Sequence, residues 1–286
     1  MPTILAPVPL GGRLWDWSRT CVFGVVNVTP DSFYDGGRHV EPAQAVEHGL
    51  ALAEAGADVI DVGGESTRPG STPVPETEEL NRVLPVIEGL VTAGCPAPIS
   101  VDTYKARVAR EAVAAGASVI NDISGLRLDR GMAQAAAETG ATVVLGHLRG
   151  APATMQTGIH FRDVVREVAD ELRDSVREAV RAGVPAGRIW VDPGIGFGKT
   201  AEQSLALLRA TGQLREAVGY PIMVGPSRKS FIGAVTDEPA GQRLMGTCAA
   251  VAAVVLAGAD AVRIHDVAEL GPAVRVADAL RRGARR

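Results

Sequence analysis

Short apolar runs recur along the chain, and each is followed by polar residues and then by a helical pattern. The eight runs span Val22–Val26, Val59–Val62, Pro98–Val101, Ser118–Ile120, Thr142–Leu145, Ile189–Val191, Ile222–Val224 and Asp260–Ile264. They are rich in β-branched residues and lack the alternation of strands that face water on one side. We therefore predict that each run is a parallel strand buried on both faces.

Amphipathic helices are predicted between these strands. Two segments carry apolar residues at helical spacing, namely Leu80, Val83, Leu84, Ile87 and Leu90 in the first and Val165, Val168, Leu172, Val176 and Val180 in the second. Several helices are expected to end in Ala-Gly-Ala or a close variant, centred on Gly56, Gly116, Gly140 and Gly258. A glycine there can adopt the left-handed conformation that ends a helix, and the next strand then begins at once.

The strand–helix repeat predicts the α/β class and a single closed (β/α)8 TIM barrel, which usually needs about 250 residues. An open, doubly wound sheet and a division into two smaller domains are the alternatives, although no linker is visible. The segment from Thr3 to Thr20 contains a Gly11-Gly12 turn between short apolar pieces and is expected to form a β-hairpin. We predict a hairpin over residues 1–20 that caps the bottom of the barrel, a barrel over 21–282, and a basic tail over 283–286.

Charge argues against a nucleic-acid-binding protein. The chain has 29 basic and 33 acidic residues, mixed along its length, and a net charge of -4. Nucleic-acid binding usually requires a basic excess. The last six residues, from Arg281 to Arg286, include four arginines and are interpreted as a solvated, frayed tail.

Cysteine usage and hydropathy indicate a cytoplasmic protein. The three cysteines, Cys21, Cys95 and Cys248, are far apart, which argues for a reducing compartment and against a disulfide framework or a zinc site. The first 12 residues lack the pattern of a signal peptide, and no run of about 18 apolar residues predicts a membrane span.

Polar residues gather where the predicted strands end, at the end of the barrel where active sites of this fold lie. They are Asn27, Asp61, Asp102, Asn121, His147, Asp192, Ser227, Arg228, Lys229, Arg263 and His265. Any one of them could merely cap the following helix. A barrel used only as a scaffold would not need such a residue at every strand, so we predict a ligand site.

This ring of polar residues has two chemical characters. Asp102, Asn121 and Asp192 suit a flat heterocycle with ring N–H and amino groups, because carboxylates accept those hydrogens and an amide can pair with a carbonyl edge. The cationic residues suit an anion and above all phosphate. They are Arg68, Arg228, Lys229, Arg263 and His265. A heterocycle joined to a phosphate leaving group would use both halves.

The loops after the strands support a ligand site. Residues 27–37 and 63–70 are rich in glycine, proline and small polar residues and are too long for simple connectors, so lids are expected there. The run from Asp192 to Thr200 invites comparison with a phosphate-binding loop, but Pro193 stands where that pattern needs glycine. We interpret it as a tight loop that lets a ligand approach the backbone, with Phe197 covering a ring.

Taken together, these segments resemble dihydropteroate synthase, over nearly the whole chain from about Gly24 to Val267. The motifs that carry the resemblance are residues 26–33, 61–70, 100–103, 121–123, the loop after Asp192, 227–230 and 263–267. The resemblance implies a transferase of folate biosynthesis. Such an enzyme joins (7,8-dihydropterin-6-yl)methyl diphosphate to 4-aminobenzoate and releases 7,8-dihydropteroate and diphosphate.

The resemblance also implies roles for individual residues. The pterin ring would be held by Asp102, Asn121, Asp192 and Lys229, with Phe197 beside it. The diphosphate would be held by Asn27, Arg263 and His265, with Mg²⁺ shared between Asn27 and phosphate oxygens. The arylamine site would be shaped by Phe33, Thr67, Arg68, Pro69 and Ser230. The charges that form during the reaction would be stabilised by Asp102, Asp192, Lys229, Arg263 and His265. His265 would donate a hydrogen bond to the anion rather than act as a general base.

Further expectations follow from the resemblance. Sulfonamides should compete with 4-aminobenzoate, and the protein should form a homodimer, for which the apolar helix from Cys248 to Leu256 is a candidate interface or simply core. Four positions depart from the family pattern: Gly146, Ser204, Pro226 and Gln242. Loss of the usual methionine at Gly146 is expected to loosen packing around the pterin. Pro226 is expected to stiffen the loop of Lys229, and Ser204 and Gln242 are expected to have structural roles.

Three rival interpretations remain. A pterin-binding methyltransferase domain would share the ring-binding positions but would not need residues 67–70 or 227–230. A non-catalytic relative would bind a pterin or a partner protein without turnover. An unrelated phosphosugar barrel would leave the first two loops unexplained.

Overall fold

The computed structural model describes residues 5–29, 42–68 and 70–283. Its main sheet holds eight parallel strands in the order β8-β7-β6-β5-β4-β3-β10-β9. They are β3 (Cys21–Asn27), β4 (Val59–Gly63), β5 (Ile99–Asp102), β6 (Val119–Asp122), β7 (Thr142–Gly146), β8 (Ile189–Asp192), β9 (Met223–Val224) and β10 (Ala261–Ile264). A bridge between Val191 and Ile222 joins the two outer strands, so the sheet curls into a nearly closed barrel. The predicted barrel is confirmed, and the doubly wound alternative is wrong.

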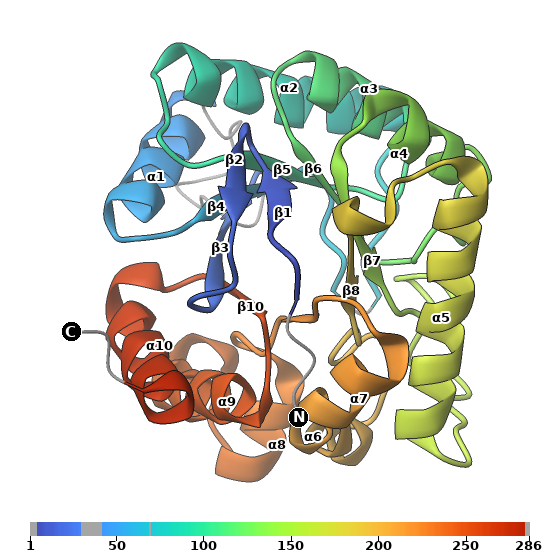
Figure 1. The fold of residues 1–286 in the computed structure, drawn as a ribbon, viewed down its shortest axis with the longest axis vertical. Helices are drawn as coiled ribbons and strands as arrows, with labels where there is room; N and C mark the ends of the chain where they lie inside the picture. Colours follow the sequence, from blue (N-terminus) through green and yellow to red (C-terminus); the bar gives the residue numbers. More distant parts are fainter. Residues whose placement is uncertain (1–4, 30–41, 69, 284–286) are drawn as a thin grey trace.

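Ten α-helices in the described part of the chain surround the barrel (Figure 1). They are α1 (Pro42–Glu54), α2 (Glu76–Thr92), α3 (Ala106–Ala114), α4 (Met132–Thr139), α5 (Val164–Ala182), α6 (Ala201–Arg209), α7 (Thr211–Val218), α8 (Ser230–Thr236), α9 (Leu244–Ala257) and α10 (Val267–Arg282). The two predicted stripes lie on α2 and α5, although Val180 at the end of the second is exposed. The four predicted terminal glycines all have positive φ, as a left-handed helix end requires.

The core has two layers that follow from the alternation of side chains along each strand. One set of strand residues packs outward against the helices. The other set points into the lower half of the barrel, where Phe23 and Trp190 are fully buried. The lower half is therefore filled by side chains.

The N-terminal hairpin closes the lower end of the barrel. Strands β1 (Val8–Leu10) and β2 (Arg13–Trp15) pair antiparallel, and the turn residues Gly11 and Gly12 have φ of 55° and 79°. Trp17, which follows the hairpin, packs on Trp190 with ring centroids 4.8 Å apart. Figure 1 shows the hairpin lying across the barrel. The predicted hairpin cap is confirmed.

The C-terminal arginines differ from the prediction. Arg281 donates from Nη1 to the carbonyl oxygens of Val255 (3.1 Å) and Ala259 (2.6 Å), and Arg282 donates to the carbonyl of Trp17 (2.8 Å). A guanidinium at the end of α9 satisfies carbonyl groups that have no partner within the helix. The predicted solvated tail is therefore wrong for these two arginines, and residues 284–286 lie outside the described part.

Within the described ranges, the structure has no helix that is both long and apolar enough to cross a membrane.

Candidate active site

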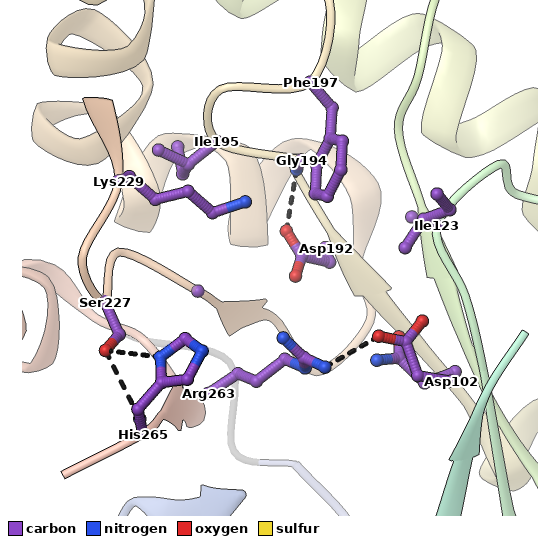
Figure 2. A pocket seen from close by; sticks show the side chains of 13 residues that line it. Asp102, Ile123, Asp192, Gly194, Ile195, Phe197, Ser227, Lys229, Arg263 and His265 are labelled. Atoms are coloured by element: carbon purple, nitrogen blue, oxygen red, sulfur yellow. Dashed lines mark hydrogen bonds and ion pairs between the residues drawn. The ribbon is translucent and has the colours of Figure 1, made fainter. Parts of the chain in front are cut away.

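A cavity with about 510 Å³ of empty space, part of it open to solvent, lies at the carboxyl ends of the strands. Seven of the predicted site residues line it, namely Asp102, Asn121, Asp192, Phe197, Lys229, Arg263 and His265. Ser227, which the sequence placed in the ring of strand-end polar residues, also lines it, and the remaining lining residues were not predicted as ligand contacts: Ile123, Gly146, Gly194, Ile195 and Gly225. Figure 2 shows that the two aspartates, Lys229 and Arg263 surround one space.

Arg263 joins two carboxylates at the floor of the cavity. Its Nε donates to Oδ2 of Asp61 at 2.6 Å, and its Nη2 donates to Oδ2 of Asp102 at 2.7 Å. Asn121 donates from Nδ2 to the same Asp61 oxygen at 3.1 Å. Burial alone would lower the pKa of Arg263, but the two carboxylates raise it above its ordinary value. Arg263 therefore stays charged and belongs to both the ring half and the anion half of the site.

Asp61 was noted as a strand-end residue but was given no role from the sequence. It is fully buried, and within the described chain its Oδ1 has no hydrogen-bond partner. Its Oδ2 holds both Arg263 and Asn121 in place. The alternation of side chains along β4 could have identified Asp61 as an inward-facing residue. Asp61 points to the same side of the barrel as Val59, which lies in the inward-facing cluster.

The two cavity carboxylates are both withdrawn from water. Burial raises the pKa of Asp102 to about 7, although Arg263 opposes that shift. Burial also raises the pKa of Asp192, whose Oδ1 accepts a hydrogen bond from the backbone N–H of Gly194 at 2.7 Å. Desolvated carboxylates bind N–H groups of a ligand strongly, because little hydration is lost when the ligand enters.

Lys229 and Phe197 form one wall of the cavity. The Lys229 Nζ lies 3.9 Å from the centroid of the Phe197 ring, within the range of a cation–π contact. Burial lowers the pKa of Lys229 to about 8. An ammonium and an aromatic face beside two carboxylates suit a flat, polar ring system.

At the cavity, the loop after β8 can pass close to His147 because Gly194 has no side chain. Gly194 has φ of 64°, and a Cβ there would lie 2.0 Å from the carbonyl oxygen of His147. Lys199, the residue that suggested a phosphate-binding loop, is buried and donates to the carbonyls of His147, Gly194 and Phe197. Its ammonium is thus used to hold the loop and does not face a ligand.

His147 does not face the cavity. Its Nδ1 lies 2.9 Å from Nζ of Lys199, and its Nε2 lies 3.1 Å from Oε2 of Glu171. Burial lowers the pKa of His147 to about 4, so its ring is neutral near pH 7. This strand-end residue ties the loops after β7 and β8 to α5.

His265 is oriented by Ser227. The backbone N–H of His265 donates to Oγ of Ser227 at 3.3 Å, and that hydroxyl lies 2.9 Å from the ring Nδ1. When the hydroxyl donates to Nδ1, the neutral ring carries its proton on Nε2. Burial and then Arg263 lower the pKa of His265 to about 3. The ring offers one N–H donor, which suits an anion better than proton abstraction.

The three predicted arylamine residues in the described part of the chain do not line this cavity. Thr67 is half-buried and Arg68 is exposed on the loop after β4, and Ser230 is exposed at the first residue of α8. Phe33 and Pro69 lie outside the described residues.

Two further predicted residues, Asn27 and Arg228, are not among those that line the cavity. Asn27 ends β3 and is half-buried. The described residues contain no group of three or more histidine, cysteine or acidic side chains that could hold a metal. Arg228 forms an exposed ion pair with Asp266 instead of facing the cavity.

Gly146 packs tightly, contrary to the expectation that it loosens the site. A Cβ at this position would lie 2.6 Å from Cα of Ile123, so the glycine lets the ends of β6 and β7 approach each other. Ser204 is buried and donates to the carbonyl of Thr200 at 2.8 Å, and Gln242 lies on an exposed 3₁₀ turn. Pro226 is buried, and its carbonyl accepts from the N–H of Lys229 at 3.4 Å.

Comparison with known proteins places this arrangement in context. A family model described as "Pterin binding enzyme" matches residues 23–265. The dihydropteroate synthase of Synechocystis sp. is 44% identical over 276 residues, which cover 96% of this chain and 95% of the relative.

Solved structures agree with the sequence comparison. The dihydropteroate synthase of Xanthomonas albilineans with 4-aminobenzoic acid has a TM-score of 0.89 and 45% identity, covering 96% of this chain and 98% of that one. A structure of the same enzyme with 7,8-dihydropteroate has a TM-score of 0.86 and 43% identity, and the match covers 96% of this chain and 99% of that one. The Yersinia pestis enzyme in a sulfonamide drug complex has a TM-score of 0.90 and 40% identity, and the match covers 96% of this chain and 99% of that one.

Proposed function

The chain belongs to the pterin-binding enzymes and, within them, to the dihydropteroate synthases, and we propose that its cavity joins a pterin diphosphate to an aromatic amine. The reaction condenses (7,8-dihydropterin-6-yl)methyl diphosphate with 4-aminobenzoate. Its products are 7,8-dihydropteroate and diphosphate. This assigns the protein to the transferases of folate biosynthesis.

The pterin ring occupies the part of the cavity between Asp102 and Lys229. Asp102 and Asp192 accept hydrogen bonds from its N–H and amino groups, and Lys229 donates to its acceptor edge. Asn121 donates one N–H to Asp61, which orients its amide so that the carbonyl oxygen and the second N–H remain for the ligand. Phe197 covers one face of the ring.

The diphosphate lies toward His265 and Arg263. The neutral His265 ring donates from Nε2, and the guanidinium of Arg263 supplies a fixed positive charge. Asn27 offers a hard amide oxygen, which fits a magnesium site that takes its other ligands from phosphate oxygens and water. When bound, Mg²⁺ would neutralise part of the diphosphate charge.

The chemistry needs no nucleophile from the protein. The nitrogen of the arylamine attacks the methylene carbon of the pterin, the C–O bond to diphosphate breaks, and its electron pair leaves with the diphosphate. The new C–N bond forms while the nitrogen loses a proton to solvent. Asp102 and Asp192 stabilise positive charge on the pterin, whereas Arg263 and His265 stabilise the departing anion.

The arylamine site lies next to the pterin cavity and is shaped by the loops that carry Phe33, Thr67, Arg68, Pro69 and Ser230. Ser230 is the first residue of α8, whose N–H groups favour the carboxylate of 4-aminobenzoate. Sulfonamides resemble the amine and compete with it for this site. Homodimer formation and a cytoplasmic location are further parts of the proposal.

One observation carries the proposal: two desolvated carboxylates, Asp102 and Asp192, face a cavity that also contains Lys229, Arg263 and a neutral His265. The test is diphosphate release by the purified protein with the pterin diphosphate and Mg²⁺, with and without 4-aminobenzoate. Release that depends on the amine supports the synthase. Pterin binding without release would instead indicate a methyltransferase-like or non-catalytic relative.

A further inference from the structure

A buried group of four residues lies beneath the loop that follows β4, and the proposed reaction does not use it. We call Glu65, Val74, Glu79 and Lys105 the loop base. Glu65 begins the loop after β4, Val74 lies nine residues later near its end, Glu79 lies on α2, and Lys105 precedes α3. The loop base therefore brings together segments that are far apart in the sequence.

Lys105 joins these segments through one ammonium group. Its Nζ donates to Oε2 of Glu65, to Oε2 of Glu79 and to the carbonyl oxygen of Val74 at 2.8 Å. Its side chain is only 14% exposed, and the two carboxylates are 4% and 1% exposed. All three N–H donors of the ammonium are thus used, which fixes its position.

Glu65 is held on both of its oxygens. Oε1 accepts from the hydroxyl of Tyr104 at 2.7 Å, and Oε2 accepts from the backbone N–H of Val74 at 3.2 Å as well as from Lys105. The start and the end of the loop are therefore closed onto one carboxylate. Thr67 and Arg68, which are assigned to the arylamine, lie on the chain between these two closed ends.

The loop base is also connected to the pterin cavity. Lys105 follows Asp102 by three residues, so one short segment after β5 serves both places. The Tyr104 side chain packs against the cluster of Ile123, Leu148 and Met155, and Ile123 lines the cavity. Tyr104 and Lys105 thus link the loop base to the wall of the cavity.

We propose that Lys105, supported by Tyr104, is a positioning residue for the arylamine half of the site. It holds the ends of the loop so that Thr67 and Arg68 stand at the correct distance from the pterin-bound methylene. Without its charge, two buried carboxylates would face each other, and their repulsion would open the loop base. The inference rests on the proposed synthase function and adds to it the residues that set affinity for the amine.

The test compares Lys105→Met with Lys105→Arg and with a matched control, Arg107→Met. Arg107 lies two residues away and forms an exposed ion pair with Glu76, so its removal tests a general loss of positive charge near α2 and α3. We expect Lys105→Met to raise KM for 4-aminobenzoate and Ki for a sulfonamide at least tenfold. Kd for the pterin diphosphate should stay within twofold, and Lys105→Arg should recover most of the amine affinity.

Each other outcome counts against the proposal. Equal losses for amine and pterin, or an unchanged KM for the amine, would overturn the role of Lys105 while the synthase function stands. If Lys105→Met does not fold, Tyr104→Phe decides, because it removes one hydrogen bond and no charge. It should raise KM for the amine two- to fivefold without changing pterin binding, and an unchanged KM would refute the inference. Absence of amine-dependent turnover in the unaltered protein would overturn the function and the inference together.

Discussion

At the scale of single residues, the cavity places two carboxylates around one guanidinium. Asp61 and Asp102 both accept hydrogen bonds from Arg263, and Asp61 also holds Asn121. The buried Asp61 therefore acts through its neighbours and is not itself a residue that lines the cavity. Asp102 is left with one oxygen for a ligand, so the proposed contact with the pterin would be directional.

Replacing either cavity aspartate by asparagine should weaken pterin binding. Asp102→Asn and Asp192→Asn each place an N–H donor where the ring also donates, and a lost charged hydrogen bond costs roughly 1.5–3 kcal/mol, or about 10- to 100-fold in Kd. Calorimetric titration with a pterin measures the change. Asp174→Asn on the exposed face of α5 is the control. Normal turnover in both cavity variants would refute the assignment of the ring.

Pterin affinity should depend on pH through Asp102. An ionised carboxylate accepts an N–H hydrogen bond much more strongly than a protonated carboxyl group does, and burial raises the pKa of Asp102 to about 7 in the free protein. Below pH 7 the ligand must displace a proton, so affinity falls by about tenfold per pH unit, and above pH 7 it levels off. Titration of a pterin without the diphosphate between pH 5.5 and 8 measures this. The slope should vanish in Asp102→Asn, and a flat profile in the unaltered protein would contradict the assignment.

Most side chains of the cavity could be predicted from sequence, because the carboxyl ends of barrel strands converge. The exceptions depend on side-chain direction. His147 directly follows β7 yet turns away from the cavity toward Lys199, and Arg228 pairs with Asp266 outside it. A shift of one residue reverses the side of a strand on which a side chain lies, and sequence alone does not fix that register at a strand end.

At the scale of secondary-structure elements, the eight strands were predictable because each is a continuous apolar run covered by helices. The short pairing between β8 and β9, where the barrel closes, could not be predicted in the same way. Strand β9 has only two residues and is followed by Gly225 and Pro226, and proline has no N–H to continue the ladder. Separation of α6 and α7 at Ala210 also left no clear signal in the sequence.

The hairpin element should matter for stability and not for substrate binding. Trp17 is buried against Trp190 at the lower end of the barrel, opposite the cavity. Trp17→Ala should lower the free energy of unfolding by about 3–5 kcal/mol, as other large-to-small core changes do, with KM for both substrates unchanged. Urea denaturation and steady-state kinetics measure the two effects.

The control for this experiment lies in the same hairpin. Leu14 is 71% exposed, so Leu14→Ala should change stability by less than about 0.5 kcal/mol. Equal stability losses in the two variants, or a manyfold change of KM in Trp17→Ala, would contradict the separation of cap and site.

At the scale of the whole molecule, the outer face of α9 and α10 is unusually apolar for a free surface. Met245 is 73% exposed and Leu256 is 48% exposed on α9, and Val276 and Leu280 on α10 are 60% and 72% exposed. These two helices pack side by side, and exposed apolar side chains that gather on one surface mark interaction sites. We predict that this face joins two copies of the chain.

Sedimentation should then give the mass of two chains of 29.7 kDa each. Met245→Glu should shift the protein toward the mass of one chain, because a charge without a partner is costly to bury. Val180→Glu on α5 replaces a similarly exposed apolar residue on another side of the barrel and should leave the mass unchanged. A single-chain mass for the unaltered protein at micromolar concentration would exclude the dimer.

The three tryptophans of the chain are Trp15, Trp17 and Trp190, and all of them belong to the cluster beneath the barrel. The cluster that the cap completes therefore contains all three tryptophans, the main source of the protein's intrinsic fluorescence. Its emission reports whether the lower end of the barrel is closed. Quenching on addition of a pterin that absorbs at the emission wavelength would reflect energy transfer from this cluster, because Trp190 lies two residues before Asp192 at the cavity. Diphosphate has no chromophore and should leave the signal unaltered.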